Sequence, residues 1–207
     1  CAAATMLGGC AVRSPAGYSA LFNGRNLKNW QGLVEPPDRA RMSSAELKKA
    51  QAAADARMKE HWRVEEKTPG FDGRGDNLCT TEPCGDFELL VGWRILKNGD
   101  SGIYLRGTPQ VQIWDNPIGS GGLYNNEKNP SRPLAVADRP IGEWNTFRIR
   151  MIGDRVTVHL NDVLVVDNTP LENFWARSKP LPARGPIELQ SHGNTLYFRN
   201  IFVRRLD

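Results

Sequence analysis

Residues 87–95 of the chain, FELLVGWRI, decide its fold class. The alternation runs through all nine residues without a break. The odd positions are Phe87, Leu89, Val91, Trp93 and Ile95, and the even positions are Glu88, Leu90, Gly92 and Arg94. Successive side chains of an extended strand point to opposite faces of its sheet, so this alternation gives one apolar face and one mixed face. The pattern predicts a strand of an antiparallel sheet that packs on a core through one side.

Further strand-like runs follow on both sides of this segment, separated by turns rich in Gly, Pro, Asn and Asp. They cover residues 102–106, 110–114, 146–152, 155–160, 163–167, 187–190 and 195–204. Many short strands with turn punctuation predict an all-β fold, a jelly-roll sandwich of two antiparallel sheets. Residues 42–60 interrupt the pattern with apolar residues at three- to five-residue steps, and Ser43 with Glu46 predicts the N-terminal cap of one helical insertion.

The composition is that of an ordinary soluble domain, with 40% apolar and 24% charged residues in 207. That length suits one domain, which we assign to residues 18–207. The net charge is +4, but the basic residues are scattered along the sequence. No run of Lys or Arg indicates a polyanion-binding stripe, so we expect no nucleic-acid partner.

The first residues, CAAATMLGGC, are small and apolar and end in Leu-Gly-Gly-Cys. They resemble a bacterial lipobox, in which Cys10 would carry the lipid, and are too short to span a bilayer. We therefore expect residues 1–17 to be a signal-peptide remnant and lipoprotein tether, and the protein to be exported, periplasmic or anchored to the outer membrane. The alternative is a disordered, uncharged N-terminus that happens to contain Cys.

Cys79 and Cys84 bracket a Pro-containing turn in the sequence CTTEPC. An oxidising compartment would allow a disulfide between them, and two free buried thiols are the alternative. A zinc pair is disfavoured, because no His and no second Cys pair lies near in the sequence.

Three of the predicted strands carry unusual polar faces. Their apolar residues alternate with bulky groups that form directed hydrogen bonds, where an ordinary solvated face would carry Thr, Lys, Glu and Ser. The set is Tyr104, Arg106, Gln110, Gln112, Trp114, Glu188, Gln190 and His192. Aromatic rings bind the C–H faces of sugars, and amides, carboxylates and guanidinium groups bind their hydroxyls, so this face predicts a carbohydrate-handling cleft. If His192 and Glu188 converge with Asp115, the site could perform acid–base chemistry or hold a divalent cation.

Several short segments of the chain occur in the order in which one known family has them. They are residues 21–24 with Trp30, 85–89, 100–107, 111–116, 142–145 with Phe147 and Arg148, 160–162, 187–193 and 198–201. Together they resemble the 3-keto-disaccharide hydrolase domain family, and the resemblance covers residues 18–206.

The resemblance implies a concanavalin-like jelly roll and cleavage of glycosides already oxidised at C3, by hydrolysis or by elimination. A ketone at C3 acidifies the C2 proton, so the reaction needs a base, a group that holds the enolate and an acid for the leaving oxygen. Carried over position by position, it implies a catalytic set of His192, Glu188, Arg106 and Asp115. We expect His192 or Glu188 to be the base, and Arg106 or a metal to hold the enolate. An upstream sugar 3-dehydrogenase would supply the substrate.

The substrate-binding residues that we expect are Tyr104, Gln112, Trp114, Gln190, Tyr124 and Asn125. Tyr124 and Asn125 belong to the long loop of residues 119–130, which also contains Asn126 and could close over substrate. Gly92 is a departure from the family, many members of which have a carboxylate at this position, and it puts catalysis in doubt.

Two other functions fit the same residues. A non-catalytic carbohydrate-binding module would need the aromatic and amide groups but no converging acid and base, and the fold hosts both kinds of protein. A purely structural envelope lipoprotein would have no concave polar cleft.

Overall fold

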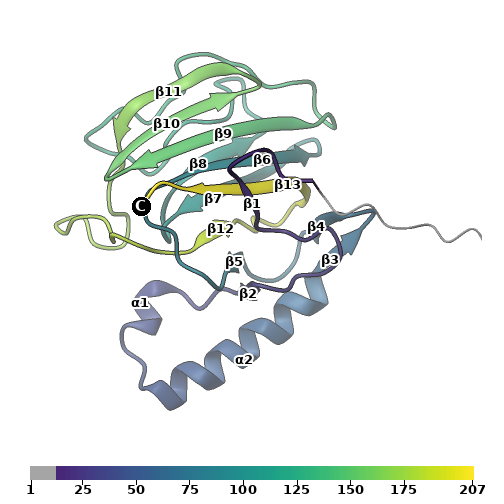
Figure 1. The fold of residues 1–207 in the computed structure, drawn as a ribbon, viewed down its shortest axis with the longest axis vertical. Helices are drawn as coiled ribbons and strands as arrows, with labels where there is room; N and C mark the ends of the chain where they lie inside the picture. Colours follow the sequence, from purple (N-terminus) through teal and green to yellow (C-terminus); the bar gives the residue numbers. More distant parts are fainter. Residues whose placement is uncertain (1–12) are drawn as a thin grey trace, which may run out of the picture.

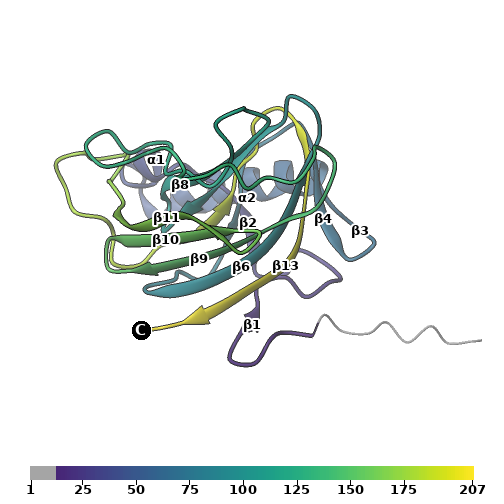
Figure 2. The ribbon, with the colours of Figure 1, turned by 90° about the horizontal axis from the view of Figure 1, so that it is seen from above.

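A computed structural model describes residues 13–207 of the chain. These residues form two antiparallel sheets stacked as a sandwich, with a helical segment on one side (Figures 1 and 2). Cys10 and the rest of the predicted tether lie outside the described residues. The predicted all-β jelly-roll class is confirmed by this arrangement.

The larger sheet has eight strands among the described residues, in the order β11-β10-β9-β6-β13-β4-β3, with β1 paired to β13. Their bounds are β1 (Ser19–Ala20), β3 (Trp62–Glu65), β4 (Thr68–Asp72), β6 (Phe87–Ile95), β9 (Asn145–Ile152), β10 (Arg155–Leu160), β11 (Val163–Pro170) and β13 (Thr195–Arg205). The smaller sheet has five strands in the order β2-β5-β12-β7-β8. Their bounds are β2 (Trp30–Gly32), β5 (Leu78–Thr80), β7 (Asp100–Leu105), β8 (Thr108–Trp114) and β12 (Ile187–Leu189).

The core lies between the sheets and follows the predicted alternation. The apolar face of β6, from Phe87 to Ile95, is buried there, and so are Ile103 and Leu105 of β7, Val111 and Ile113 of β8, and Ile187 and Leu189 of β12. Because these residues point into the core, the residues between them on β7, β8 and β12 point to the outer face of the five-stranded sheet.

Helix α2 (Ser44–His61) confirms the predicted insertion. The Ser43 side chain accepts from the Glu46 amide and the Glu46 carboxylate accepts from Ser43, so the capping box is complete. The helix packs on β2, where a Cβ at Gly32 would lie 2.5 Å from the carbonyl carbon of Ala54. Only glycine permits this approach, which holds the helix against the edge of the five-stranded sheet (Figure 1).

Short elements were missed by the sequence patterns. Helix α1 (Pro36–Arg39) precedes α2, and β4 (Thr68–Asp72) runs into a stretch rich in Gly and Asp that has no strand-like alternation. A strand of three to five residues offers too few alternations to stand out from a loop. Within the described residues, no helix is both long and apolar enough to cross a membrane.

Of the two alternatives for Cys79 and Cys84, the structure has the free, buried thiols and no disulfide between them. Cys79 points to the outer face of β5, where its Sγ donates to the carbonyl of Gln31 at 3.6 Å. Cys84 packs into the core between the sheets. The turn between them therefore sends the two side chains to different faces.

Candidate functional site

The strand register places a row of functional side chains across the whole five-stranded sheet. Gln31 pairs with Cys79, Cys79 with Glu188, Glu188 with Tyr104, and Tyr104 with Gln110. Because paired residues of adjacent strands point to the same face, the side chains of all five lie on the outer face. The predicted polar face is therefore real, and Glu188 stands at its centre.

Hydrogen bonds organise the side chains on the β8 side of this row. The Gln190 amide donates to the Tyr104 hydroxyl at 3.3 Å. The Gln110 amide donates to Gln112 at 2.6 Å, and the Gln112 amide donates to Asp100 at 2.7 Å. These bonds orient the amide planes, and a sugar hydroxyl would meet groups that are already fixed.

A cleft of about 460 Å³ opens above the other half of the row. Gln31, Cys79 and Glu188 line it from the sheet, and Arg39 lines it from α1. Trp175, from the connection between β11 and β12, contributes another wall. The Trp175 ring is 39% exposed and its indole N–H donates to the carbonyl of Gly107 at 2.9 Å, which fixes the ring as a platform.

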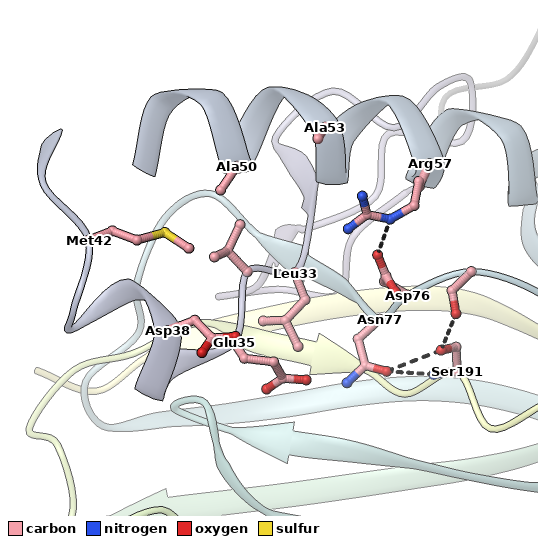
Figure 3. Close-up of a pocket in the computed structure, with 12 residues that line it drawn as sticks. Leu33, Glu35, Asp38, Met42, Ala50, Ala53, Arg57, Asp76, Asn77 and Ser191 are labelled. Atoms are coloured by element: carbon pink, nitrogen blue, oxygen red, sulfur yellow. Dashed lines mark hydrogen bonds and ion pairs between the residues drawn. The ribbon is translucent and has the colours of Figure 1, made fainter. Parts of the chain in front are cut away.

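A second cavity of about 470 Å³ adjoins the first and shares Leu33 and Val34 with it. It lies between the helices and the strands, and Figure 3 shows Glu35 and Asp38 on one side of it and Arg57 of α2 on another. Arg57 pairs with Asp76 at 2.7 Å. The Asn77 side chain accepts from the Ser191 amide at 2.9 Å.

Glu188 has the most perturbed environment of this site. Glu188 is 3% exposed, and its Oε1 has no hydrogen-bond partner among residues 13–207. Burial, followed by the charge of Glu35, raises the pKa of Glu188 to about 8, although a hydrogen bond from Asn77 opposes the change. The carboxyl group is therefore largely protonated at neutral pH.

Glu35 is the nearest acidic partner in electrostatic terms. Burial raises the pKa of Glu35 above its usual value, and the charges of Asp38 and Asp76 add to this effect. Two carboxyl groups that repel each other titrate apart, so one can hold a proton while the other is ionised. Such a pair can act as acid and base in one reaction.

The structure does not bring the other predicted catalytic residues to Glu188. His192 lies beyond β12 with its side chain 58% exposed, and its Nδ1 is 3.7 Å from Asp100. Asp115 accepts from the backbone amide of Asn98 at 2.8 Å, so it caps a turn. Neither residue lines the cleft beside Glu188.

Arg106 differs from the expectation that it faces outward with Tyr104. The register shifts after Tyr104 and Arg106 has a φ of 56°, so the alternation of the strand ends before it. Its buried guanidinium donates to the carbonyls of Gly85 at 2.8 Å and Gly153 at 3.0 Å and pairs with Asp86 at 2.6 Å. Arg106 borders the cleft, but its donors are engaged in joining the loops at the end of the sandwich.

The remaining predicted binding residues lie toward the β8 edge. Trp114 and Tyr124 pack edge to face at 5.5 Å and line a smaller cavity of about 230 Å³ together with Gln112. The Trp114 indole donates to the carbonyl of Gly119 at 2.7 Å. Asn125 uses its backbone carbonyl to accept from Arg177 at 2.7 Å. These groups could extend the sugar-binding surface away from Glu188.

The donor set for a metal is not assembled in the described part of the chain. No group of three or more His, Cys, Asp or Glu side chains there lies close enough to hold an ion. His192, Glu188 and Asp115 in particular form no such group.

Comparison with known proteins identifies the family. A sequence profile of the 3-keto-alpha-glucoside-1,2-lyase-like domain matches residues 17–204. The chain belongs to this family. A relative from Bacteroides thetaiotaomicron named 3-keto-disaccharide hydrolase is 24% identical, over 92% of this chain and 79% of that protein.

Solved structures share the fold of this 3-keto-alpha-glucoside-1,2-lyase-like domain. A candidate glycosyl hydrolase from Parabacteroides distasonis superposes with a TM-score of 0.68 and 27% identity, over 93% of this chain and 85% of that chain. A second candidate glycosyl hydrolase from the same organism gives a TM-score of 0.66 and 20% identity, over 92% and 94% of the two chains.

Gly92 of this family member does not line the cleft beside Glu188. Gly92 lies on β6 of the eight-stranded sheet, on the face away from the core, whereas Glu188 is on the outer face of the other sheet. A Cβ at Gly92 would lie 2.8 Å from Cγ of Arg199, which crosses the strand at this point. Gly92, where many relatives have a carboxylate, therefore lies on the other sheet from Glu188.

Sequence reasoning missed Glu35, Arg39 and Trp175. All three lie outside the strands whose alternation defined the polar face, on segments that fold back over it. A single Trp or Glu in a connection carries no periodic signal, so only the fold places Arg39 and Trp175 at the cleft and Glu35 at the adjoining cavity.

Proposed function

We propose that this chain cleaves the glycosidic bond of 3-keto-glycosides in the cleft beside Glu188. The observation that carries the proposal is a buried carboxyl group, with a pKa of about 8, in the wall of a cleft large enough for a sugar. Membership of the 3-keto-alpha-glucoside-1,2-lyase-like family supports the substrate class, and the relative named 3-keto-disaccharide hydrolase supports the reaction.

The chemistry divides between the two coupled carboxyl groups. Ionised Glu35, which lines the cavity adjoining the cleft, removes the acidic C2 proton of the 3-keto-sugar, and an enolate forms. The electron pair of the enolate then forms the C1–C2 double bond as the C1–O bond breaks. Protonated Glu188 gives its proton to the leaving oxygen. The products are an alcohol and a 2-hydroxyglucal-type enone, and addition of water across the new double bond gives the products of hydrolysis.

Three groups around the cleft can hold the sugar during this reaction. The fixed Trp175 ring offers a platform to the C–H face of a pyranose. Gln31 and Arg39 line the same cleft and supply donors for hydroxyl or ketone oxygens. A second sugar would contact Tyr104 on β7 and the residues Gln190 and His192, which come directly after β12. The expectation that His192 is the base remains as a second hypothesis.

Release of the aglycone from a 3-keto-glucoside tests the proposal. Glu188→Gln should lower kcat/KM by about a hundredfold or more, because the variant keeps the shape of the side chain and lacks the transferable proton. Glu60→Gln is the matched control, since the Glu60 side chain on α2 is 71% exposed. Unaltered turnover in Glu188→Gln would remove Glu188 from the mechanism, and loss of turnover in His192→Ala alone would favour the second hypothesis.

Product analysis separates the remaining possibilities. A 2-hydroxyglucal-type product indicates elimination, and its absence with free sugar present indicates direct hydrolysis. The same assay with and without added divalent cation tests the predicted metal. Saturable glycan binding by wild-type protein without any turnover of 3-keto-glucosides would instead identify a carbohydrate-binding module.

The cellular setting is part of the same proposal. A lipid on Cys10 would tether the domain to a bacterial membrane, and a sugar 3-dehydrogenase would produce the 3-keto-glycoside that it consumes. Metabolic labelling with a fatty acid in wild type and Cys10→Ser tests the anchor.

A further inference from the structure

A second group of charged and aromatic residues lies on the opposite side of the sandwich from Glu188. It occupies the outer face of the eight-stranded sheet, where Tyr197 on β13 pairs with Arg94 on β6 and Arg199 pairs with Gly92. Trp144 immediately precedes Asn145, which pairs with Trp93, so Trp144 lies beside Arg94. In Figure 2 the strands β6, β9 and β13 lie on the side away from the helices.

The aromatic rings hold two guanidinium groups in place. The Arg199 Cζ is 4.1 Å from the centroid of the Trp144 ring, and the Arg94 Cζ is 5.1 Å from the same centroid. Arg94 also lies 4.5 Å from the centroid of the Tyr197 ring. Stacking of this kind fixes the plane of a guanidinium and leaves its N–H edges available.

Two glycines make the arrangement possible. A Cβ at Gly92 would lie 2.8 Å from Cγ of Arg199, and a Cβ at Gly70 would lie 3.2 Å from Cδ1 of Tyr197. The absence of side chains on β6 and β4 thus lets the arginine stem and the tyrosine ring lie flat across the sheet. The cluster is built into the sheet by residues from β4, β6 and β13.

The positive charge of the cluster has no carboxylate partner in residues 13–207. Arg94, Arg139 and Arg199 form no ion pair there, and Arg94 Nε is buried without a hydrogen-bond acceptor. Arg106, the other buried or half-buried arginine among residues 13–207, is by contrast paired with Asp86. Burial and then the charges of Arg94 and Arg139 lower the pKa of Arg199, so both of these guanidinium groups lie near enough to Arg199 to repel it.

We propose that Arg94, Arg139 and Arg199 form a binding site for one compact oxyanion: a sulfate, phosphate or carboxylate group. Guanidinium N–H edges match the oxygen spacing of these groups, and an anion would relieve the repulsion within the cluster and give Arg94 Nε an acceptor. We propose one compact oxyanion and not a polyanion, because the site is a small group of three arginines and not a long stripe of basic residues. The site is independent of the cleft beside Glu188, since it faces outward from the other sheet.

Anion titration followed by NMR tests the site. Sulfate is added to the full protein at constant ionic strength, with chloride as the balancing ion, and the indole resonance of Trp144 is followed after assignment with Trp144→Phe. We expect a saturable shift, and about tenfold weaker binding in Arg199→Gln and in Arg94→Gln, because each loses a charged donor. Arg155→Gln is the control: it removes the same charge from the same sheet, where Asp154 lies 3.9 Å from Arg155 Nε.

Further arms identify the source of the oxyanion. Phosphate, glucuronate and neutral glucose are titrated in the same way, and saturable binding of any of the three oxyanions with no response to glucose supports the site. The proposal is overturned if no oxyanion gives a saturable shift of Trp144, or if Arg155→Gln weakens binding as much as Arg199→Gln. It is also overturned if only vesicles of anionic phospholipid bind, because that result describes diffuse attraction to a membrane surface. Thermal unfolding of each variant checks that the sheet is intact.

Discussion

The buried carboxyl group of Glu188 makes a quantitative prediction about how folding depends on pH. The pKa of Glu188 is about 8 in the folded protein, against a reference value of 4.5. The folded state therefore holds its proton over a range of pH in which the unfolded state has lost it. Stability from this residue is fully present below pH 4.5 and is lost as the pH rises to about 8.

The size of the effect follows from the pKa difference. One pKa unit corresponds to about 1.4 kcal/mol, so the change from 4.5 to about 8 corresponds to about 5 kcal/mol of unfolding free energy at high pH. That is comparable with the whole stability of many domains. Glu188→Gln keeps the volume of the side chain and its capacity to bond with Asn77, but it cannot ionise. The variant should therefore lack this pH dependence and become more stable than the wild type above pH 8.

Urea unfolding measured by tryptophan fluorescence at pH 5, 7 and 9 tests this prediction. The quantity of interest is the unfolding free energy of Glu188→Gln minus that of the wild type, because pH effects from other residues cancel in the difference. It should rise by several kcal/mol from pH 5 to pH 9, and by less in a Glu35→Gln background, where the repelling charge is absent. A difference that stays constant to about 0.5 kcal/mol over this range would refute the assignment of a raised pKa to Glu188.

Three further predictions follow from the same geometry. If Glu188 is the acid, kcat of the wild type should fall as the pH rises through about 8; a profile flat to pH 9.5 would contradict the role. Trp175→Ala should raise KM for the 3-keto-glucoside about tenfold with a smaller change in kcat, whereas Trp175→Phe should restore most of the affinity. Gly32→Ala should destabilise the protein by about 2 kcal/mol or more in urea unfolding, since its Cβ would lie 2.5 Å from the carbonyl carbon of Ala54; wild-type stability would show that α2 can move away from β2.

The sequence was informative wherever a feature repeats along the chain. The nine residues of β6 and the alternation in β7, β8 and β12 sorted core from surface correctly, because burial between two sheets imposes a period of two. The same alternation placed Glu188, Tyr104 and Gln110 on one outer face. Arg106 departs from the alternation, because a positive φ ends the strand there and turns the side chain away.

Features that depend on how distant segments fold together were not predictable in this way. Glu35 matters because α1 and α2 fold back beside β2 and hold it near Glu188, and no spacing in the sequence links residues 153 positions apart. The pKa of Glu188 depends on burial beneath the same segment. Alternation could identify the candidate acid, but only the fold supplies the environment that makes it one.

Charge gives the clearest case of this limit. Arginines scattered through the sequence argued against a polyanion-binding stripe. Yet Arg94 and Arg199, 105 residues apart in the sequence, meet on one face because β13 pairs with β6, and Arg139 from the loop before β9 lies near enough to Arg199 to lower its pKa. Gly92 shows how the sequence and the fold give different information about one residue. In the sequence, Gly92 stands where many relatives have a carboxylate. In the sheet, its lack of a side chain leaves the space through which Arg199 reaches Trp144. A carboxylate side chain at this position would fill that space and neutralise the cluster. The identity of this one residue therefore bears on the anion site, while the chemistry proposed for Glu188 on the other sheet is unaffected by it.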